Sequence, residues 1–535
     1  MLTPVDSPGK NASHTSIPST PSFALSIFLL GAIVSVISIG LLIFHAELHL
    51  LMCIALFIAA ATALFACVTG QTIAGIGRYD ESSLLSGNAK EIRKTHSKIP
   101  PSTRMRTDTF AEESFCRPRP FTLARDLLHA IGYTIWRAKD ALIIFILIGV
   151  LIAALIQSGT VATLIYWGVL LIHPGWFLPA GLLLCSLMSI ATGTAWGTVG
   201  TAGVVLMGIG SAMDIPLPLV AGMVVCGATF GDKMSPISDT TNLAAMAART
   251  DLYHHIRSMT YTTAPAYLIT LLAFALVGRQ YTGYELPEDK LLAMESAITS
   301  AYQIGWWTMA PLIVLILMSI LRIGAITTML TASIVAVLVA LGMQSGDAAS
   351  ILAALWHGDS VHTPIDSLTS LFSRGGIVSM WFTVLLSLQA LALGGVLTDY
   401  GFMRAILAGL LTRVKRIGSL VTSTIICALV GNLGMGEAYL SIVLGGQLFS
   451  DAYDDADIDR GVLSRCLEEG ATLTTPLIPW TTAGVFFSQT LEISTLEYLP
   501  FAWMNLLNPL MGIAFAYLGW GLMLRKTVRE NPTPK

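Results

Sequence analysis

Three ionisable side chains stand close together in the stretch GATFGDKMSPISDTTNLA, residues 227–244, namely Asp232, Lys233 and Asp239. The polar residues that accompany them are Ser235, Thr240, Thr241 and Asn242. Carboxylates, hydroxyls and carbonyls are hard oxygen ligands of the kind that bind alkali cations. A carboxylate can also carry a proton in place of the cation. This stretch therefore indicates reversible binding of a small cation or a proton.

The composition of the chain sets the surroundings of these charges. The chain has 535 residues, of which 54% are hydrophobic and 12% charged, and its mean hydropathy is +0.71. An average soluble domain has about 25% charged residues. Apolar runs long enough to cross a bilayer recur throughout, and we expect about 10–13 membrane segments. The chain is therefore predicted to be an all-α polytopic protein that lies in the lipid bilayer.

The distribution of Lys and Arg predicts how the chain lies in the membrane. Basic residues crowd the stretch 71–125, whereas residues 344–373 contain none. The positive-inside rule places the first stretch, a basic insertion, in the cytoplasm and the second outside. The tails at 1–22 and 525–535 are then both cytoplasmic. Arg374 is the one charge that disagrees with this topology.

Short polar segments recur at a nearly constant separation of 240 to 243 residues. The matched pairs are SPISDTTNLA at 235–244 with TPLIPWTTAG at 475–484, GTAWGT at 193–198 with GEAYLS at 436–441, and Gly159 with Gly401. Agreement among separate matches indicates an internal duplication, which in transporters locates the binding site.

The charges beside the matched spans indicate that the two halves are inverted. The span at 139–157 begins on the basic side, whereas its counterpart at 377–397 begins beside the acidic loop. We therefore expect inverted-topology repeats at 23–278 and 306–524, joined by a connecting loop at 279–305. Such repeats build a site near the membrane midplane from discontinuous helices.

Two kinds of interruption are expected in each repeat. The glycine-rich segment 191–203, with Thr194 and Trp196, and its counterpart with Glu437 are predicted to be breaks within helices. The stretch around Asp232 and its uncharged counterpart TLTTPLIPWTTAG are predicted to be re-entrant hairpin tips. The alternatives without a functional role are a small-residue packing face for the first pair and a solvated loop for the second.

Several long motifs resemble one family. They are FGDKMSPISDTTNLA, ATGTAWGTVGTAGVVLMGIG, RGGIVSMWFTVLLSLQALALGGVL and LSRCLEEGATLTTPLIPW. They are similar to the NhaC-type sodium/proton antiporters of the ion-transporter superfamily, from about residue 23 to 524 except in the basic insertion. The resemblance implies inverted repeats, each with a hairpin and a broken helix, in a prokaryotic inner membrane.

The resemblance also implies residues for the ion site. In sodium-coupled relatives Ser, Asn and Thr at the hairpin tips hold the cation and the substrate. The matching positions here are Ser235, Thr240, Thr241 and Asn242 in the first tip and Thr474, Thr475, Thr481 and Thr482 in the second, which has no Asn.

The function expected from these residues is exchange of sodium for protons by alternating access. Na⁺ and H⁺ would compete for Asp232, with Asp239 and Glu437 as further ligands and Lys233 paired with one aspartate. The alternative is sodium- or proton-coupled exchange of small organic anions or amino acids on the same fold. No cofactor and no nucleic acid are expected as partners, and a homodimer is compatible with the sequence.

An enzyme is not expected. The chain contains no HExxH motif, and Asp232 does not stand in a GxGD motif. His254 and His255, adjacent to each other and close to Arg257, are expected to face an interface. The cysteines, seven in all, form no CxxC pair, which indicates neither a structural metal nor a disulfide framework.

Overall fold

The computed structural model describes residues 21–69, 71–72, 120–171, 173–282, 288–321, 323–344, 347–358, 361, 363–365, 368–369, 372–412, 414 and 416–523. Most of the basic insertion and nearly all of the predicted tails lie outside these residues. The described part is helical. It contains ten helices long and apolar enough to cross a membrane, or up to twelve if each of two bent pairs is one span. The predicted all-α polytopic fold is confirmed.

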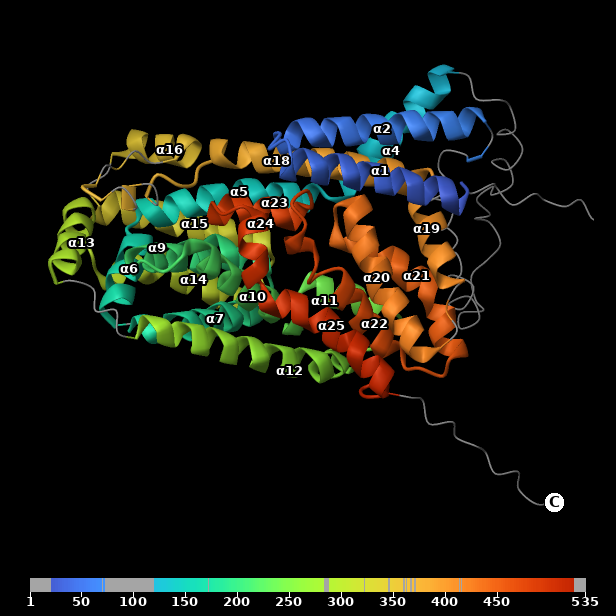
Figure 1. Ribbon diagram of the computed structural model, residues 1–535. Helices are drawn as coiled ribbons and strands as arrows, with labels where there is room; N and C mark the ends of the chain where they lie inside the picture. The colour runs from blue at the N-terminus through green and yellow to red at the C-terminus, as the bar shows by residue number, and fades with distance from the viewer. Residues whose placement is uncertain are drawn as a thin grey trace, which may run out of the picture.

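The helices of the first half are α1 (Phe23–Leu42), α2 (Leu48–Val68), α4 (Pro120–Arg137), α5 (Lys139–Gln157), α6 (Thr160–Leu171), α7 (Pro174–Thr192), α8 (Ala195–Thr198), the π-helical turn η1 (Val199–Gly203), α9 (Val204–Ala212), α10 (Leu217–Met234), α11 (Asp239–Ala247) and α12 (Leu252–Gly278). Figure 1 shows α13 (Glu288–Ala301) at one end of the molecule. It lies within the stretch predicted as a connecting loop.

The helices of the second half are α14 (Ala310–Ile320), α15 (Ala325–Met343), α16 (Ala348–His357), α18 (Trp381–Asp399), α19 (Phe402–Leu411), α20 (Ile417–Met435), α21 (Ala438–Asp455), α22 (Arg460–Gly470), the 3-10 turn η5 (Thr475–Leu477), α23 (Thr482–Leu491), α24 (Thr495–Tyr498) and α25 (Trp503–Leu518). Long apolar sequences can form such helices because every backbone polar group is then paired within the segment.

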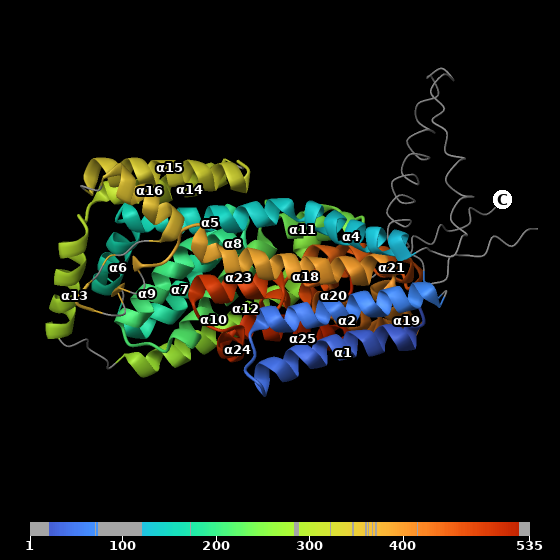
Figure 2. The same cartoon turned by 90° about the horizontal axis from the view of Figure 1, so that it is seen from above.

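Matching helices of the two halves run in opposite directions. In Figures 1 and 2, α6 and α13 lie at one end of the molecule and α4 and α19 at the other. The chain passes along α5 from α4 to α6, and along α18 from α16 to α19. These antiparallel paths are those of an inverted repeat.

The first hairpin consists of α7, α8, η1 and α9. The chain reverses at Gly193, whose φ of 70° and ψ of 19° are left-handed, and Thr194 then starts α8 with extended backbone. Antiparallel contacts link its two arms, since Thr201 Oγ1 lies 3.7 Å from Met188 Sδ. Ile209 near the end of α9 returns to Gly168 of α6, next to the start of α7. The chain thus enters and leaves this hairpin on one side.

The second hairpin, α20 and α21, repeats this geometry from the opposite end of the molecule (Figures 1 and 2). Gly436 has φ 67° and ψ 7°, and Glu437 follows with extended backbone, as Thr194 does. Thr424 Oγ1 and Tyr453 Oη, far from the tip on its two arms, lie 3.2 Å apart. Glycine adopts a left-handed backbone conformation at little energetic cost, which is why both reversals occur at glycine.

The first broken helix is α10 with α11, and the second is α22 with α23. α10 packs on α7 of the first hairpin, whereas α11 packs on α21 and α22. In the same way α22 packs on α20, and α23 packs on α8 and η1. Each broken helix therefore continues from one hairpin to the other instead of turning back.

This arrangement corrects the sequence prediction at both kinds of interruption. The segments with Thr194 and Glu437, predicted as breaks within helices, are the hairpin tips. The segments around Asp232 and Thr475, predicted as hairpin tips, are breaks through which the helix direction continues. Pro236 and Pro476 interrupt each helix because proline has no N–H to donate and disfavours α backbone in the residue before it.

Close packing of α10 on α7 fixes the end of α10 where the acidic residues lie. A side chain at Gly231 would place its Cβ 2.5 Å from the backbone oxygen of Ser186, so only glycine permits this approach. The neighbouring Asp232 is therefore held at a defined depth beside the tip of the first hairpin.

Arg374, the charge that disagreed with the predicted topology, is ion-paired. Its Nη2 lies 2.7 Å from Oε2 of Glu492, and its side chain is only 11% exposed. The pairing compensates the charge of a nearly buried side chain, but the positive-inside rule counts Lys and Arg rather than net charge, so Arg374 still disagrees with the predicted topology.

Candidate functional site

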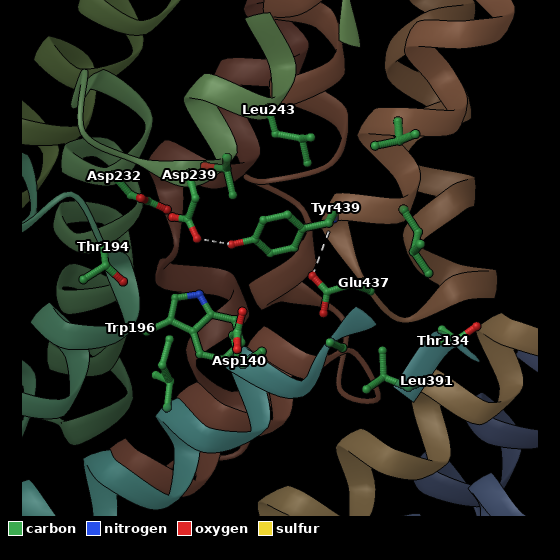
Figure 3. Close-up of a pocket in the computed structure, with 16 residues that line it drawn as sticks. Thr134, Asp140, Thr194, Trp196, Asp232, Asp239, Leu243, Leu391, Glu437 and Tyr439 are labelled. Atoms are coloured by element: carbon green, nitrogen blue, oxygen red, sulfur yellow. Dashed lines mark hydrogen bonds between the residues drawn. The ribbon is translucent and has the colours of Figure 1, made fainter. Parts of the chain in front are cut away.

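The two hairpin tips and the first broken helix surround a cavity of about 300 Å³ in the middle of the molecule. Figure 3 shows its walls. The lining residues are Thr134, Ala138, Asp140, Ala141, Ile144, Thr194, Trp196, Asp232, Asp239, Thr240, Leu243, Leu391, Glu437, Tyr439, Leu440 and Val443. The segments that sequence repetition linked thus meet at one place.

Two aspartates from the first broken helix lie side by side in this cavity (Figure 3). Asp232, the third-last residue of α10, is 5% exposed, and its Oδ1 accepts a hydrogen bond of 2.8 Å from Ser238 Oγ. Asp239 begins α11 and is exposed to the cavity, where its Oδ2 accepts a hydrogen bond of 2.6 Å from Tyr439 Oη. The break in the helix brings the two carboxylates together.

The tip of the second hairpin supplies a third carboxylate. Glu437 is 5% exposed and caps α21, where its Oε1 accepts from the backbone N–H of Tyr439 at 3.5 Å. Its Oε2 accepts a hydrogen bond of 2.6 Å from Thr482 Oγ1. A helix N-terminus favours negative charge, so this position suits an ionised carboxylate. Thr194 occupies the same place in the first hairpin.

Aromatic rings close one wall of the cavity. The Trp196 ring stacks on Phe145 with centroids 4.8 Å apart and on Phe486 at 5.3 Å. Beyond this wall a narrow extension of about 30 Å³ reaches Thr475 and Thr482 in the second broken helix. The second break therefore contributes hydroxyls, whereas the first contributes carboxylates.

The other predicted site residues hold the two breaks in shape. Ser235 Oγ donates to Ile190 O at 2.8 Å, Thr241 Oγ1 to the backbone oxygens of Asp232 and Lys233 at 3.2 Å each, and Asn242 Nδ2 to Ser238 O at 2.7 Å. Thr474 and Thr481 likewise donate to backbone oxygens of their own segment. These residues bond to backbone and do not line the cavity.

An asparagine serves the second break, although the break itself contains none. Asn432 of α20 donates from Nδ2 to Ala471 O at 2.7 Å and to the hydroxyls of Thr474 and Thr475 at 2.9 and 2.8 Å. It is fully buried. The second break thus has no Asn in its own sequence, and the neighbouring hairpin supplies the amide.

Lys233 does not pair with either aspartate in the cavity. Its side chain is fully buried and does not line the cavity. Successive residues of an α-helix point about 100° apart, so Asp232 and Lys233 cannot face the same space. The prediction that Lys233 neutralises one of the two aspartates is not supported by this geometry.

Ser238, Tyr439 and Asp140 also belong to the site and were not among the predicted residues. Ser238 holds Asp232, Tyr439 holds Asp239, and the exposed Asp140 at the start of α5 lines the cavity. Ser238 and Tyr439 could have been identified from the sequence, since Ser238 stands in the acidic stretch and Tyr439 in the segment matched to Thr194. Asp140 stands at the start of a helix without a repeated motif, so the sequence did not indicate it.

The arrangement suits an exchange of ions. Two adjacent ionised carboxylates repel each other, and either a cation between them or a proton on one of them removes the repulsion. Among the described residues no three His, Cys, Asp or Glu side chains converge as a metal centre. The two carboxylates and the neighbouring hydroxyls present hard oxygen atoms of the kind that bind small cations.

Comparison with known proteins places this site in context. Residues 227–520 match the model of the Na⁺/H⁺ antiporter family. The chain is 37% identical to the malate-2H⁺/Na⁺-lactate antiporter of Bacillus subtilis, over 74% of this chain and 84% of that protein. It is 38% identical to the Na⁺/H⁺ antiporter NhaC of Alkalihalophilus pseudofirmus, over 71% and 82%. It is also 30% identical to the arginine/ornithine antiporter ArcD of Halobacterium salinarum, over 76% and 84%.

Proposed function

Because this chain belongs to the Na⁺/H⁺ antiporter family, we propose that it exchanges sodium for protons across the membrane by alternating access, with Asp232 as the carboxylate for which the two ions compete. Asp239, Glu437 and Thr240 supply or orient further oxygens around the cation. The chain is a transporter, and the chemistry of its site is ion binding and release.

The charge of the cavity carries this proposal. Its acidic lining residues are Asp140, Asp232, Asp239 and Glu437, and no Lys, Arg or His joins them among the lining residues. The clustered negative charge attracts cations and raises their local concentration. Sodium and protons are the two cations that the family name provides.

The same charge argues against the alternative cargoes. A small organic anion would face four carboxylic side chains without a cationic partner on the described wall. An amino acid could place its ammonium group among the carboxylates, but its own carboxylate would again find no basic residue. Burial of an uncompensated charge is costly, so the cavity disfavours both classes.

The position of the cavity suggests which side of the membrane it opens to. Besides the hairpin tips and the first broken helix, the cavity is lined by the start of α5, the end of α4 and the first turns of α21. These segments lie toward α4 and α19 in Figures 1 and 2, the end that the charge distribution predicts to be cytoplasmic. We infer an inward-facing state in a prokaryotic inner membrane.

Ion flux in reconstituted vesicles tests the proposal directly. Vesicles that contain the purified chain, a sodium gradient and no organic solute should show proton movement opposite to sodium. Flux that begins only after a dicarboxylate or an amino acid is added would favour the alternative. No flux under any of these conditions would contradict both.

The predicted topology can be checked by labelling single cysteines in intact cells. A cysteine introduced in 85–115 should react only with reagents that reach the cytoplasm, and one in 347–358 only with external reagents, because the two stretches are predicted on opposite sides. Native cysteines are replaced first. Labelling of both positions from one side would contradict the inverted orientation.

Glu437→Gln should raise the apparent KM for sodium roughly 2- to 10-fold, since it removes one charge from the cavity but keeps a side chain that Thr482 can bond. Sodium-dependent proton flux in vesicles measures this effect. Thr194→Ala, at the matching tip without a charge, is the control and should have a smaller effect. An unchanged sodium dependence in Glu437→Gln would limit Glu437 to capping α21.

A further inference from the structure

The cavity is larger than a sodium ion needs. Its volume of about 300 Å³ corresponds to about ten water molecules, since one water molecule takes up about 30 Å³ in the liquid. A site that holds only a bare ion surrounds it closely with oxygen atoms. Sites for small organic molecules begin at about this volume and are mostly apolar, with a few polar groups that orient the ligand. The size of the cavity is therefore that of an organic ligand.

Apolar side chains share the cavity wall with the carboxylates. Leu243 of α11 and Leu440 and Val443 of α21 line the cavity and are only half-buried. Such side chains offer no oxygen atom to a sodium ion and no hydrogen bond to the water around a hydrated one. They would stabilise the hydrocarbon part of an organic ligand, because its apolar surface is removed from water. The wall thus suits a ligand that is apolar at one end.

The other end of such a ligand must be a cation. None of the described residues that line the cavity is Lys, Arg or His. Carboxylates elsewhere have cationic partners, as Glu492 has in Arg374 at 2.7 Å. His255 is fully buried with Nδ1 2.7 Å from Ser464 Oγ, so it does not face an interface as the sequence predicted, and it does not line the cavity. The carboxylates of the wall are left for a ligand to neutralise.

Asp239 is the carboxylate most open to a bulky cation. It is exposed, and the 2.6 Å hydrogen bond from Tyr439 Oη uses only one of its two oxygens. Asp232 and Glu437 are each 5% exposed, which suits a small ion better than an organic one. Figure 3 shows the Asp239 carboxylate and the rings of Tyr439 and Trp196 around the same space. Aromatic rings also attract a cation that lies close to their face.

We propose that the cavity also binds small organic cations that carry no carboxylate, of the class of primary alkylammonium ions, in competition with sodium. The ammonium group donates to Asp239, and the alkyl chain lies along Leu243, Leu440 and Val443. A primary ammonium group fits because it combines three N–H donors with a single apolar substituent. The inference rests on the proposed function, because it requires that the same carboxylates are ionised and bind cations.

Displacement of sodium by a series of amines tests this inference. The full chain is purified in detergent at pH 8, where alkylamines are protonated as lysine is, and binds radiolabelled sodium. Chlorides of methyl-, ethyl-, propyl- and butylammonium then compete with the sodium. Each added CH₂ that contacts the apolar wall should lower the concentration for half-displacement roughly 3- to 4-fold. Equal displacement by methylammonium and butylammonium would overturn the inference, because only charge would then be recognised.

Two control ligands separate the features of butylammonium. Tetramethylammonium has the same charge and the same number of carbon atoms but no N–H group, and 1-butanol has the same chain but no charge. Both should displace sodium roughly 10-fold more weakly than butylammonium, because hydrogen bonds between charged groups are lost. Displacement by either control at the same concentration as butylammonium would contradict the inference.

Two valines of the second hairpin provide matched variants. Val443→Thr keeps the size of a side chain on the apolar wall but makes it polar, so the preference for butylammonium over methylammonium should fall roughly 2- to 4-fold. Val430→Thr makes the same change at a half-buried residue of α20 that does not line the cavity, and this preference should persist. An unchanged preference in Val443→Thr would contradict the placement of the alkyl chain.

Sodium binding without amine separates this inference from the proposed function. If the unmodified chain binds no sodium, the proposed function fails and this inference fails with it. If the unmodified chain binds sodium, Asp232→Asn does not, and no alkylammonium ion displaces the sodium, only this inference fails. The series of amines is measured on the unmodified chain, so the result does not depend on the folding of a variant.

Discussion

Replacing Asp232 by asparagine should abolish sodium/proton exchange while the protein still folds and inserts. Asn keeps the size of the side chain and can still accept the hydrogen bond from Ser238, but it carries neither a charge nor a titratable proton. Loss of a buried charged ligand costs about 3 kcal/mol or more, which corresponds to a loss of roughly 100-fold or more in sodium binding. Flux in vesicles and thermal unfolding in detergent measure the two effects separately.

The neighbouring aspartate is the matched control for this prediction. Asp239→Asn should weaken exchange less, because Asp239 is exposed to the cavity and its bond from Tyr439 can persist in the amide. Asp232→Glu should keep part of the activity with an altered pH profile, since the charge remains and the oxygens move by one methylene. Normal exchange by a folded Asp232→Asn variant would remove Asp232 from the ion path. Normal exchange by the double Asn variant would remove the whole acidic stretch.

The duplication was the part of the fold that the sequence predicted best. Gly193 and Gly436 have nearly the same left-handed backbone, and Gly159 and Gly401 are left-handed too, with φ of 74° and 77°. These matches could be recognised in the sequence because a left-handed backbone position favours glycine in both halves. The inverted repeat also predicted that the segments with Asp232 and Glu437 both lie near the membrane midplane.

The direction of the chain after each interruption could not be predicted. Gly, Pro and Thr are suited both to a reversal and to a break with continued direction. What decides between them is the helix against which the next segment packs, α21 and α22 for α11, and α8 with η1 for α23. Such contacts between distant segments leave no local mark in the sequence.

The orientation of Lys233, in contrast, was predictable. Asp232 and Lys233 are consecutive in an apolar run of helical length, and helical geometry alone separates their directions by about 100°. The charged residues that surround Lys233 are also present in a recognised motif, since LSRCLEEG contains Arg465, Glu468 and Glu469. The sequence shows that these charges exist but not that α22 brings them against α10.

The two glutamates of this motif should respond differently to mutation, and Glu469 should have the larger effect on stability. Glu469→Ala removes the carboxylate beside Arg465 and leaves a buried guanidinium whose Nε and Nη2 already have no hydrogen-bond partner in the described structure. Breaking a buried ion pair on one side costs about 3–5 kcal/mol, because the remaining charge is uncompensated. Thermal unfolding of the purified variant should therefore begin at a much lower temperature than that of the unmodified chain.

Removing both partners separates the effect of the charge from that of the lost packing. In the double variant Arg465→Met with Glu469→Met, no unpaired charge remains and much of the volume is kept, so most of the lost stability should return. In this variant Lys233 loses the attraction of Glu469 together with the repulsion of Arg465, and it keeps Glu468 as an anionic neighbour. A double variant as unstable as Glu469→Ala would mean that Thr262, Asn508 and Gly512, which all contact Glu469, need its shape rather than its charge.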